Sequence, residues 1–73
     1  MKLTYYQDTN SLYIDLASQP GAESREISPG VVLDYDANGR LVGIDIDNAN
    51  DKVDLNEFTL SKVVGFGGGR VVA

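Results

Sequence analysis

The pattern in this sequence that most resembles a chemical site consists of four oxygen-bearing side chains within twelve residues. Asp34, Asp36 and Asn38 precede Gly39, and Asp45 stands at the twelfth position counted from Asp34. In an EF-hand calcium loop, side-chain oxygens at positions 1, 3, 5 and 12 converge on one hard cation. The spacing therefore makes Asp34, Asp36, Asn38 and Asp45 candidate ligands of a divalent cation.

The segments on both sides of this pattern favour a different structure. An EF-hand loop lies between helices, whereas residues 31–37 (VVLDYDA) and 40–46 (RLVGIDI) alternate as half-buried strands do. Asn38-Gly39 between two such segments is typical of a two-residue type I′ hairpin turn. A tight turn does not bring the first and twelfth residues of the pattern around one ion. We therefore predict a hairpin, with weak cation binding as the alternative.

The register of this hairpin follows from the loop length. A two-residue loop pairs Ala37 with Arg40, and it then puts apolar residues on one face and mainly acidic residues on the other. A three-residue loop would set Leu33 against Gly43 and a valine against an aspartate, so we reject it because it mixes the faces. The predicted pairs are Tyr35–Val42, Leu33–Ile44 and Val31–Ile46 on the apolar face, and Asp36–Leu41, Asp34–Gly43 and Val32–Asp45 on the acidic face.

A second hairpin is expected at the N-terminus. If residues 7–10 form a four-residue loop, Tyr6 faces Ser11, and the two faces again separate by polarity. The predicted apolar pairs are Tyr5–Leu12, Leu3–Ile14 and Met1–Leu16, and the polar pairs are Thr4–Tyr13 and Lys2–Asp15.

The whole chain is predicted to be a mostly β (β-rich α+β) domain, with a small antiparallel sheet of about four strands. Its hairpins span residues 1–17 and 31–47, and a polar edge segment lies between them with Ile27 as its only large apolar residue. Residues 48–52 (NANDK) are typical of a turn or a single helical turn, and Asp54 and Glu57 have the spacing of a capping box, so a short helical turn is expected near 48–58. We expect a single domain over 1–64 and a flexible glycine-rich tail over 65–73.

The acidic face is the second candidate for function. Asp34, Asp36, Asp45 and Asp47 project from one side of the hairpin, and paired carboxylates can act as general acid and base or bind metals. Such a stripe is more often a solvated surface. Because the chain has no histidine and no cysteine, it lacks an imidazole base and the usual zinc ligands. We therefore expect no catalytic residue, no cofactor and no enzyme, with an enzyme using paired carboxylates as a further alternative.

Composition indicates the kind of partner. Eleven acidic against six basic residues give a net charge of −5, which repels nucleic acid and anionic lipid. No apolar run is long enough for a membrane span, and no signal peptide is visible, so we expect a cytoplasmic protein. We expect a basic protein partner, with Tyr6, Tyr13, Asp34, Asp36, Asp45 and Asp47 as candidate contacts, and a homodimer as a further expectation.

Several motifs resemble a family of small bacterial and archaeal proteins described as domain of unknown function 2283. They are Tyr5, Asp8, residues 11–14 (SLYI), Leu16, residues 26–27, residues 29–36 (PGVVLDYD), Gly39, residues 42–46 (VGIDI) and Ala49. The resemblance covers about residues 1–54, and the region after Lys52 departs from it. It implies a short β-rich domain and brings no activity, cofactor or catalytic residue. Members encoded beside small toxin-like proteins imply an antitoxin-like or regulatory role.

Overall fold

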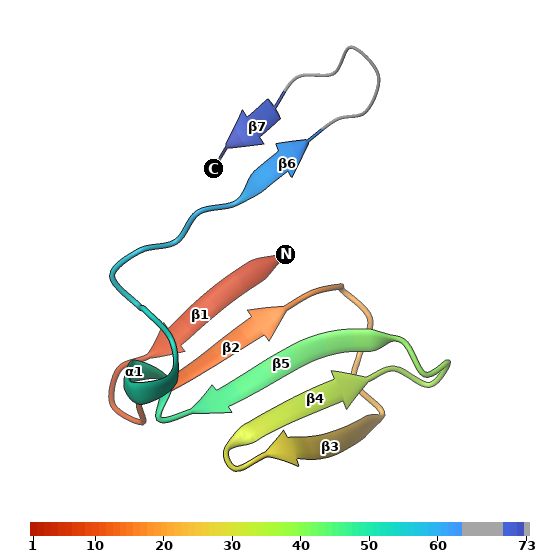
Figure 1. The fold of residues 1–73 in the computed structure, drawn as a ribbon. Coiled ribbons are helices and arrows are strands. Elements are labelled where there is room, and N and C mark those ends of the chain that lie inside the picture. Colours follow the sequence, from red (N-terminus) through yellow and green to blue (C-terminus); the bar gives the residue numbers. More distant parts are fainter. Residues whose placement is uncertain (64–69, 73) are drawn as a thin grey trace.

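The computed structural model describes residues 1–63 and 70–72. Five antiparallel strands form one sheet in the order β1-β2-β5-β4-β3, and two further strands form a separate ribbon (Figure 1). This is the mostly β, antiparallel fold that the sequence predicts. The elements are β1 (Lys2–Tyr6), β2 (Ser11–Asp15), β3 (Glu23–Ser28), β4 (Val31–Tyr35), β5 (Leu41–Asp47), α1 (Ala49–Lys52), β6 (Ser61–Val63) and β7 (Arg70–Val72).

The N-terminal hairpin has the predicted register. Tyr6 pairs with Ser11 and Leu3 with Ile14, around a loop of residues 7–10. Asn10 closes this loop with a positive φ of 54°, a conformation that asparagine tolerates better than most residues. Apolar alternation on both strands is therefore enough to fix this pairing.

The β4–β5 hairpin has the predicted register in its body but not at its turn. Leu33 pairs with Ile44 as expected, whereas Tyr35 pairs with Leu41, and Val42 is an extra, bulged residue. The two-residue type I′ turn is wrong, because Asn38 is not among the residues with positive φ. The loop has three residues, 37–39, and the predicted pairs Tyr35–Val42, Asp36–Leu41 and Ala37–Arg40 do not form.

The bulge at Val42 makes the three-residue loop, which we rejected above, compatible with an apolar face. The Asp36 amide donates to the Arg40 carbonyl at 2.8 Å, and the Gly39 amide donates to the Asp36 carbonyl at 3.1 Å. Gly39 has a φ of 80°, as the third residue of such loops requires. The extra residue at Val42 then shifts the pairing by one, so that the apolar side chains still share one face.

The two hairpins join through β2 and β5. Leu12 lies opposite Ile46, and Ile14 lies opposite Ile44, so the apolar faces of both hairpins become one surface. The core on this surface is small: Leu12, Ile46 and Ala49 are buried, and Ile14, Ile44, Val53 and Leu55 pack partly against them.

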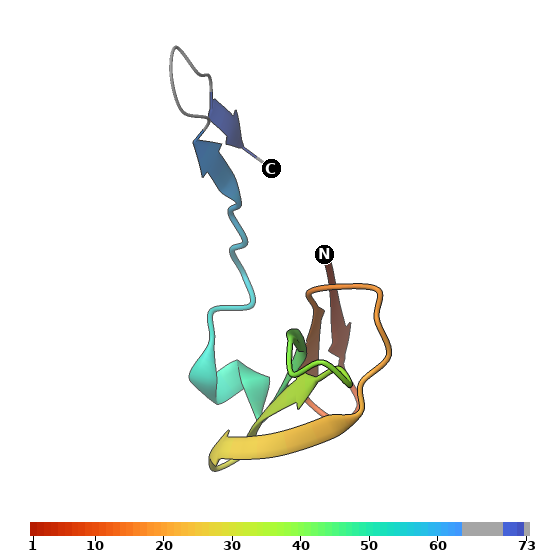
Figure 2. The same cartoon turned by 90° about the vertical axis from the view of Figure 1, so that its right-hand side faces the viewer.

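The helical turn predicted over residues 48–52 is confirmed, whereas the capping box predicts a helix start that the structure does not have. α1 is a single turn on the apolar side of the sheet (Figure 2), and Ala49 is fully buried there. Asn10 holds this turn, since its carbonyl accepts the Ala49 amide at 3.0 Å and its side chain accepts the Asn50 amide at 3.1 Å. The Asp54 carboxylate accepts the Asn56 amide instead of capping a helix, so the capping-box prediction is wrong.

The remaining strands lie at the edges of the fold. β3 is the predicted polar edge strand, and all of its residues are exposed. β6 and β7 pair with each other, with Lys62 opposite Val71, in a ribbon apart from the main sheet (Figures 1 and 2). The expected flexible tail falls largely on residues 64–69 and 73, which lie outside the described residues. The strand at Arg70–Val72 was not predicted.

Candidate functional site

The face of the sheet opposite α1 gathers carboxylates from four strands. The pairings place side chains of this face in rows across the sheet, and one row contains Lys2, Asp15, Gly43, Asp34 and Ser24 in strand order. We use the term acidic face for the five carboxylates on this side of the sheet together with Lys2. These carboxylates are Asp15, Glu26, Asp34, Asp45 and Asp47.

A hydrogen-bond network organises the centre of the acidic face. The Tyr13 hydroxyl donates to Oδ2 of Asp34 at 2.7 Å, and the Ser24 hydroxyl donates to Oδ1 at 2.6 Å. Tyr13 is on β2 and Asp34 is on β4, so the ring crosses β5 over Gly43. A Cβ atom at Gly43 would lie 2.6 Å from the ring carbon Cζ of Tyr13, which no real Cβ tolerates. Glycine is therefore required for this crossing.

Two groups on this side of the sheet, Tyr13 and Asp45, have raised pKa values. The hydrogen bond to Asp34 and partial burial, with smaller effects of the charges on Asp34, Asp15 and Asp45, raise the pKa of Tyr13 to about 12. Burial also raises the pKa of Asp45, and the neighbouring charges of Asp47 and Asp34 add to this effect. In these two groups a hydrogen bond and burial are the main causes, and the charges of neighbouring aspartates add to them.

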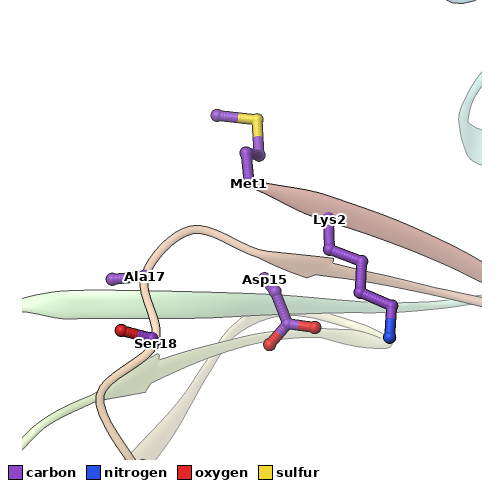
Figure 3. Close-up of a pocket in the computed structure, with 5 residues that line it drawn as sticks. All are labelled: Met1, Lys2, Asp15, Ala17 and Ser18. Atoms are coloured by element: carbon purple, nitrogen blue, oxygen red, sulfur yellow. The ribbon is translucent and has the colours of Figure 1, made fainter.

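No ion pair neutralises these carboxylates within the described part of the chain. The salt bridge found there joins Arg25 and Glu23 at 3.5 Å, and both side chains are well exposed on β3. At one end of the acidic face, Lys2 and Asp15 point to the same side of the sheet beside an open hollow of about 370 Å³ (Figure 3). The ammonium of Lys52 also lies beside Asp47, whose backbone carbonyl accepts its hydrogen bond, so five carboxylates have two lysines near them.

The four candidate cation ligands do not form one cluster. Asp34 is held by Tyr13 and Ser24, whereas one carboxylate oxygen of Asp36 accepts the amides of Asn38 and Arg40 at 2.8 and 2.9 Å. Asp36 is therefore buried in its own turn, whereas Asp34 and Asp45 are half-buried and Asp47 is exposed. Within residues 1–63 and 70–72, no three histidine, cysteine, aspartate or glutamate side chains are arranged to hold a metal ion.

The candidate partner contacts divide into free and engaged side chains. Tyr6 and Asp47 are both exposed. The Ser11 hydroxyl lies 3.4 Å from Oδ1 of Asp47. Tyr13 and Asp34 are engaged with each other. Sequence reasoning missed three residues that the tertiary structure adds to this face, namely Asp15, Ser24 and Glu26, whereas Gly43 was predicted opposite Asp34. The period-2 alternation assigned Asp15 to a polar face, but no local signal showed that the two polar faces would merge.

Hollows elsewhere on the molecule do not gather these aspartates. A shallow hollow of about 150 Å³ lies beside Asp36 and the turn, and a groove of about 370 Å³ lies on the apolar side between β1, β2 and the segment after α1. None of the three hollows described contains two of Asp34, Asp36, Asp45 and Asp47. No helix in the described residues has the length and apolar character needed to cross a membrane.

Comparison with known proteins bears on the family alone. No curated protein and no solved structure matches the chain. A family model described as protein of unknown function (DUF2283) matches residues 2–50, which contain all five strands of the sheet and the start of α1. The match covers well over half of the chain, and this chain therefore belongs to that family.

Proposed function

We propose that this protein is a non-enzymatic protein-interaction module whose acidic face binds a cationic surface on another protein. The observation that carries this proposal is the set of five carboxylates from four strands, organised by the Tyr13–Asp34–Ser24 network, with Lys2 and Lys52 as the lysines beside them. A basic protein would supply the missing charge. A small toxin-like partner, which the family resemblance implies, fits this class.

Rigidity supports binding by this face. A sheet surface presents its side chains at fixed spacings, and the bond between Tyr13 and Asp34 ties non-neighbouring strands together. A pre-organised surface loses less conformational entropy on binding than a mobile one does. Burial is the main cause of the raised pKa of Asp45, and a cationic partner would offset the added repulsion from Asp47 and Asp34.

The experiment titrates the ¹⁵N-labelled full chain with a lysine- and arginine-rich peptide, and with a glutamate-rich peptide as the charge control. We expect the cationic peptide to shift the amides around Asp15, Asp45 and Asp47, and to lose affinity as salt is added. Shifts centred on α1 or on the apolar groove would overturn the proposal.

A matched pair of variants separates a specific face from net charge alone. Asp45→Asn with Asp47→Asn removes two charges from the acidic face, whereas Asp51→Asn with Asp54→Asn removes two from α1 and the segment after it. We expect the first pair to weaken binding by about fivefold and the second by less than twofold. Equal weakening by both pairs would mean that only the total charge matters.

A further inference from the structure

The β4–β5 turn contains the one Asn-Gly pair of the sequence, Asn38-Gly39, which the proposed function does not use. Both residues are exposed, and the turn lies at the end of the sheet away from α1 (Figure 1). Asparagine is chemically labile, because the backbone nitrogen of the next residue is placed to attack its carboxamide in a five-membered ring. A side chain on that next residue obstructs the attack, and glycine has none. The other four asparagines precede residues that have a side chain.

The surroundings of Gly39 are open. A Cβ atom built there would meet no atom within 4 Å, its chain neighbours aside, so no other segment crowds this peptide. A shallow hollow of about 150 Å³ beside Asn38 keeps the turn in contact with water. Solvent therefore reaches both the carboxamide and the nitrogen that would attack it.

The side chain of Asn38 is held less firmly than that of Asn10, the asparagine that closes the other hairpin. Oδ1 of Asn10 accepts the Tyr5 hydroxyl at 2.9 Å and the Asn50 amide at 3.1 Å. Asn38 instead joins its turn through its backbone amide. Its carboxamide is therefore free to turn toward the next peptide nitrogen.

The hydrogen bonds of Asp36 oppose this attack. The Gly39 amide donates to the Asp36 carbonyl at 3.1 Å, near the long end of the usual range. The Asp36 carboxylate accepts the amides of Asn38 and Arg40, on both sides of Gly39. The nitrogen must leave this arrangement before it reacts. Local opening of an exposed turn costs less than unfolding of the whole sheet, so the reaction should follow that opening.

We propose that Asn38 is a modification site at which the folded chain deamidates spontaneously, at a rate that Asp36 restrains. The Gly39 nitrogen loses its proton and bonds to Cγ of Asn38. The bond between Cγ and Nδ2 breaks, and Nδ2 takes up a proton and leaves as ammonia. Solvent water then opens the cyclic imide. Cleavage between the ring nitrogen and Cγ gives aspartate, whereas cleavage between that nitrogen and the backbone carbonyl carbon gives isoaspartate.

Both products change the chain in one direction only. Each adds one negative charge, which takes the net charge from −5 to −6. Isoaspartate also adds one carbon atom to the main chain of a three-residue loop whose length sets the bond between the Asp36 amide and the Arg40 carbonyl. The modification therefore records the age of the protein in this hairpin. It does not rest on the proposed function, because the reaction needs no partner.

The first test keeps the folded full chain at about 37 °C and about pH 8, where base removes the amide proton, and maps its peptides by mass spectrometry over time. We expect a gain of about one mass unit at Asn38, faster than at the other four asparagines, with isoaspartate identified by electron-transfer fragmentation. Asn38→Gln is the matched control, because its longer carboxamide must close a larger ring and should stay intact. An unmodified Asn38, or faster modification at another asparagine, would overturn the proposal.

The second test examines the restraint by Asp36. Asp36→Ala should speed the modification of Asn38 about tenfold, and Asp36→Asn should speed it less because an acceptor oxygen remains. Ile46→Val is the control for a general loss of stability, since Ile46 is buried at the other end of β5, and it should change the rate less than about twofold.

In urea the parent chain and Asp36→Ala should modify Asn38 at equal rates, because the turn is then absent. Equal acceleration by Asp36→Ala and Ile46→Val in the folded state would contradict local opening. A difference that persists in urea would show that Asp36 acts through the chemistry of the chain rather than through the folded turn, and would overturn its assigned role.

Discussion

The hydroxyl of Tyr13 lies 2.7 Å from a carboxylate oxygen of Asp34, although the two residues are on strands that do not pair with each other. The ring reaches across β5 because Gly43 has no side chain there. Asp34 also accepts a bond from Ser24 on β3. One carboxylate thus connects β2, β4 and β3, and the first three predictions concern this network and its surroundings.

Replacement of Gly43 by alanine should destabilise the fold. The new Cβ would overlap the ring of Tyr13, push the hydroxyl away from Asp34 and lower the free energy of unfolding by about 2–3 kcal/mol. Urea denaturation measures this loss. Gly21→Ala is the control, because a Cβ there meets its nearest neighbour at an ordinary 3.8 Å. In a Tyr13→Ala background the Gly43→Ala penalty should largely vanish, and a full penalty there would contradict the overlap.

Tyr13 should ionise later than a free tyrosine. Ultraviolet titration of the four tyrosines should contain one component near pH 12, which Tyr13→Phe removes. Asp34→Asn should move this component toward the ordinary value of 10.0, because a neutral amide accepts a weaker hydrogen bond from the hydroxyl and also lacks the charge that opposes its ionisation. An unchanged midpoint in Asp34→Asn would contradict the assigned cause.

The same shift makes stability depend on alkaline pH. Since the pKa of Tyr13 is higher in the folded than in the unfolded state, its contribution is complete below pH 10 and is lost as pH rises through 12. The difference in unfolding free energy between the parent chain and Tyr13→Phe should therefore shrink over this range. A constant difference from pH 9 to 12 would count against the linkage.

Asp45→Asn should stabilise the protein at neutral pH. The pKa of Asp45 is raised by burial and then by Asp47 and Asp34, so its ionised form costs stability above the folded-state pKa. We expect a gain of about 0.5–1 kcal/mol at pH 7, which disappears on acidification as the parent carboxylate takes up its proton. Asp8→Asn, in the exposed β1–β2 loop, should show no comparable gain. Thermal or urea unfolding at pH 7 and pH 3 makes the comparison.

Asp36→Ala should weaken the β4–β5 hairpin. The substitution leaves the amides of Asn38 and Arg40 without their acceptor, at a cost of about 1–3 kcal/mol. Asp36→Asn keeps a carbonyl oxygen in place and should lose less. Hydrogen exchange of the two amides reports the local effect, and unchanged protection in Asp36→Ala would contradict the proposed role.

The β4–β5 turn shows why its type could not be predicted from Asn38-Gly39 alone. Residues 36–39 (DANG) have aspartate first and glycine fourth, which is also the signature of a type I turn. Asn38-Gly39 alone favoured type I′, and the competing signal was the ability of Asp36 to accept two amides of its own loop. The bulge at Val42 then restored the apolar pairing, which a rule based on loop length alone does not foresee.

Local residue patterns account for the two hairpins, the bodies of their registers and the separation of apolar from polar faces. These features depend on neighbours a few residues apart, and the period of two in a strand leaves little freedom. The pairing of β2 with β5, and hence the meeting of Tyr13, Gly43 and Asp34, arises only in the folded sheet. That pairing joins residues about thirty positions apart through backbone hydrogen bonds, which carry no local sequence signal.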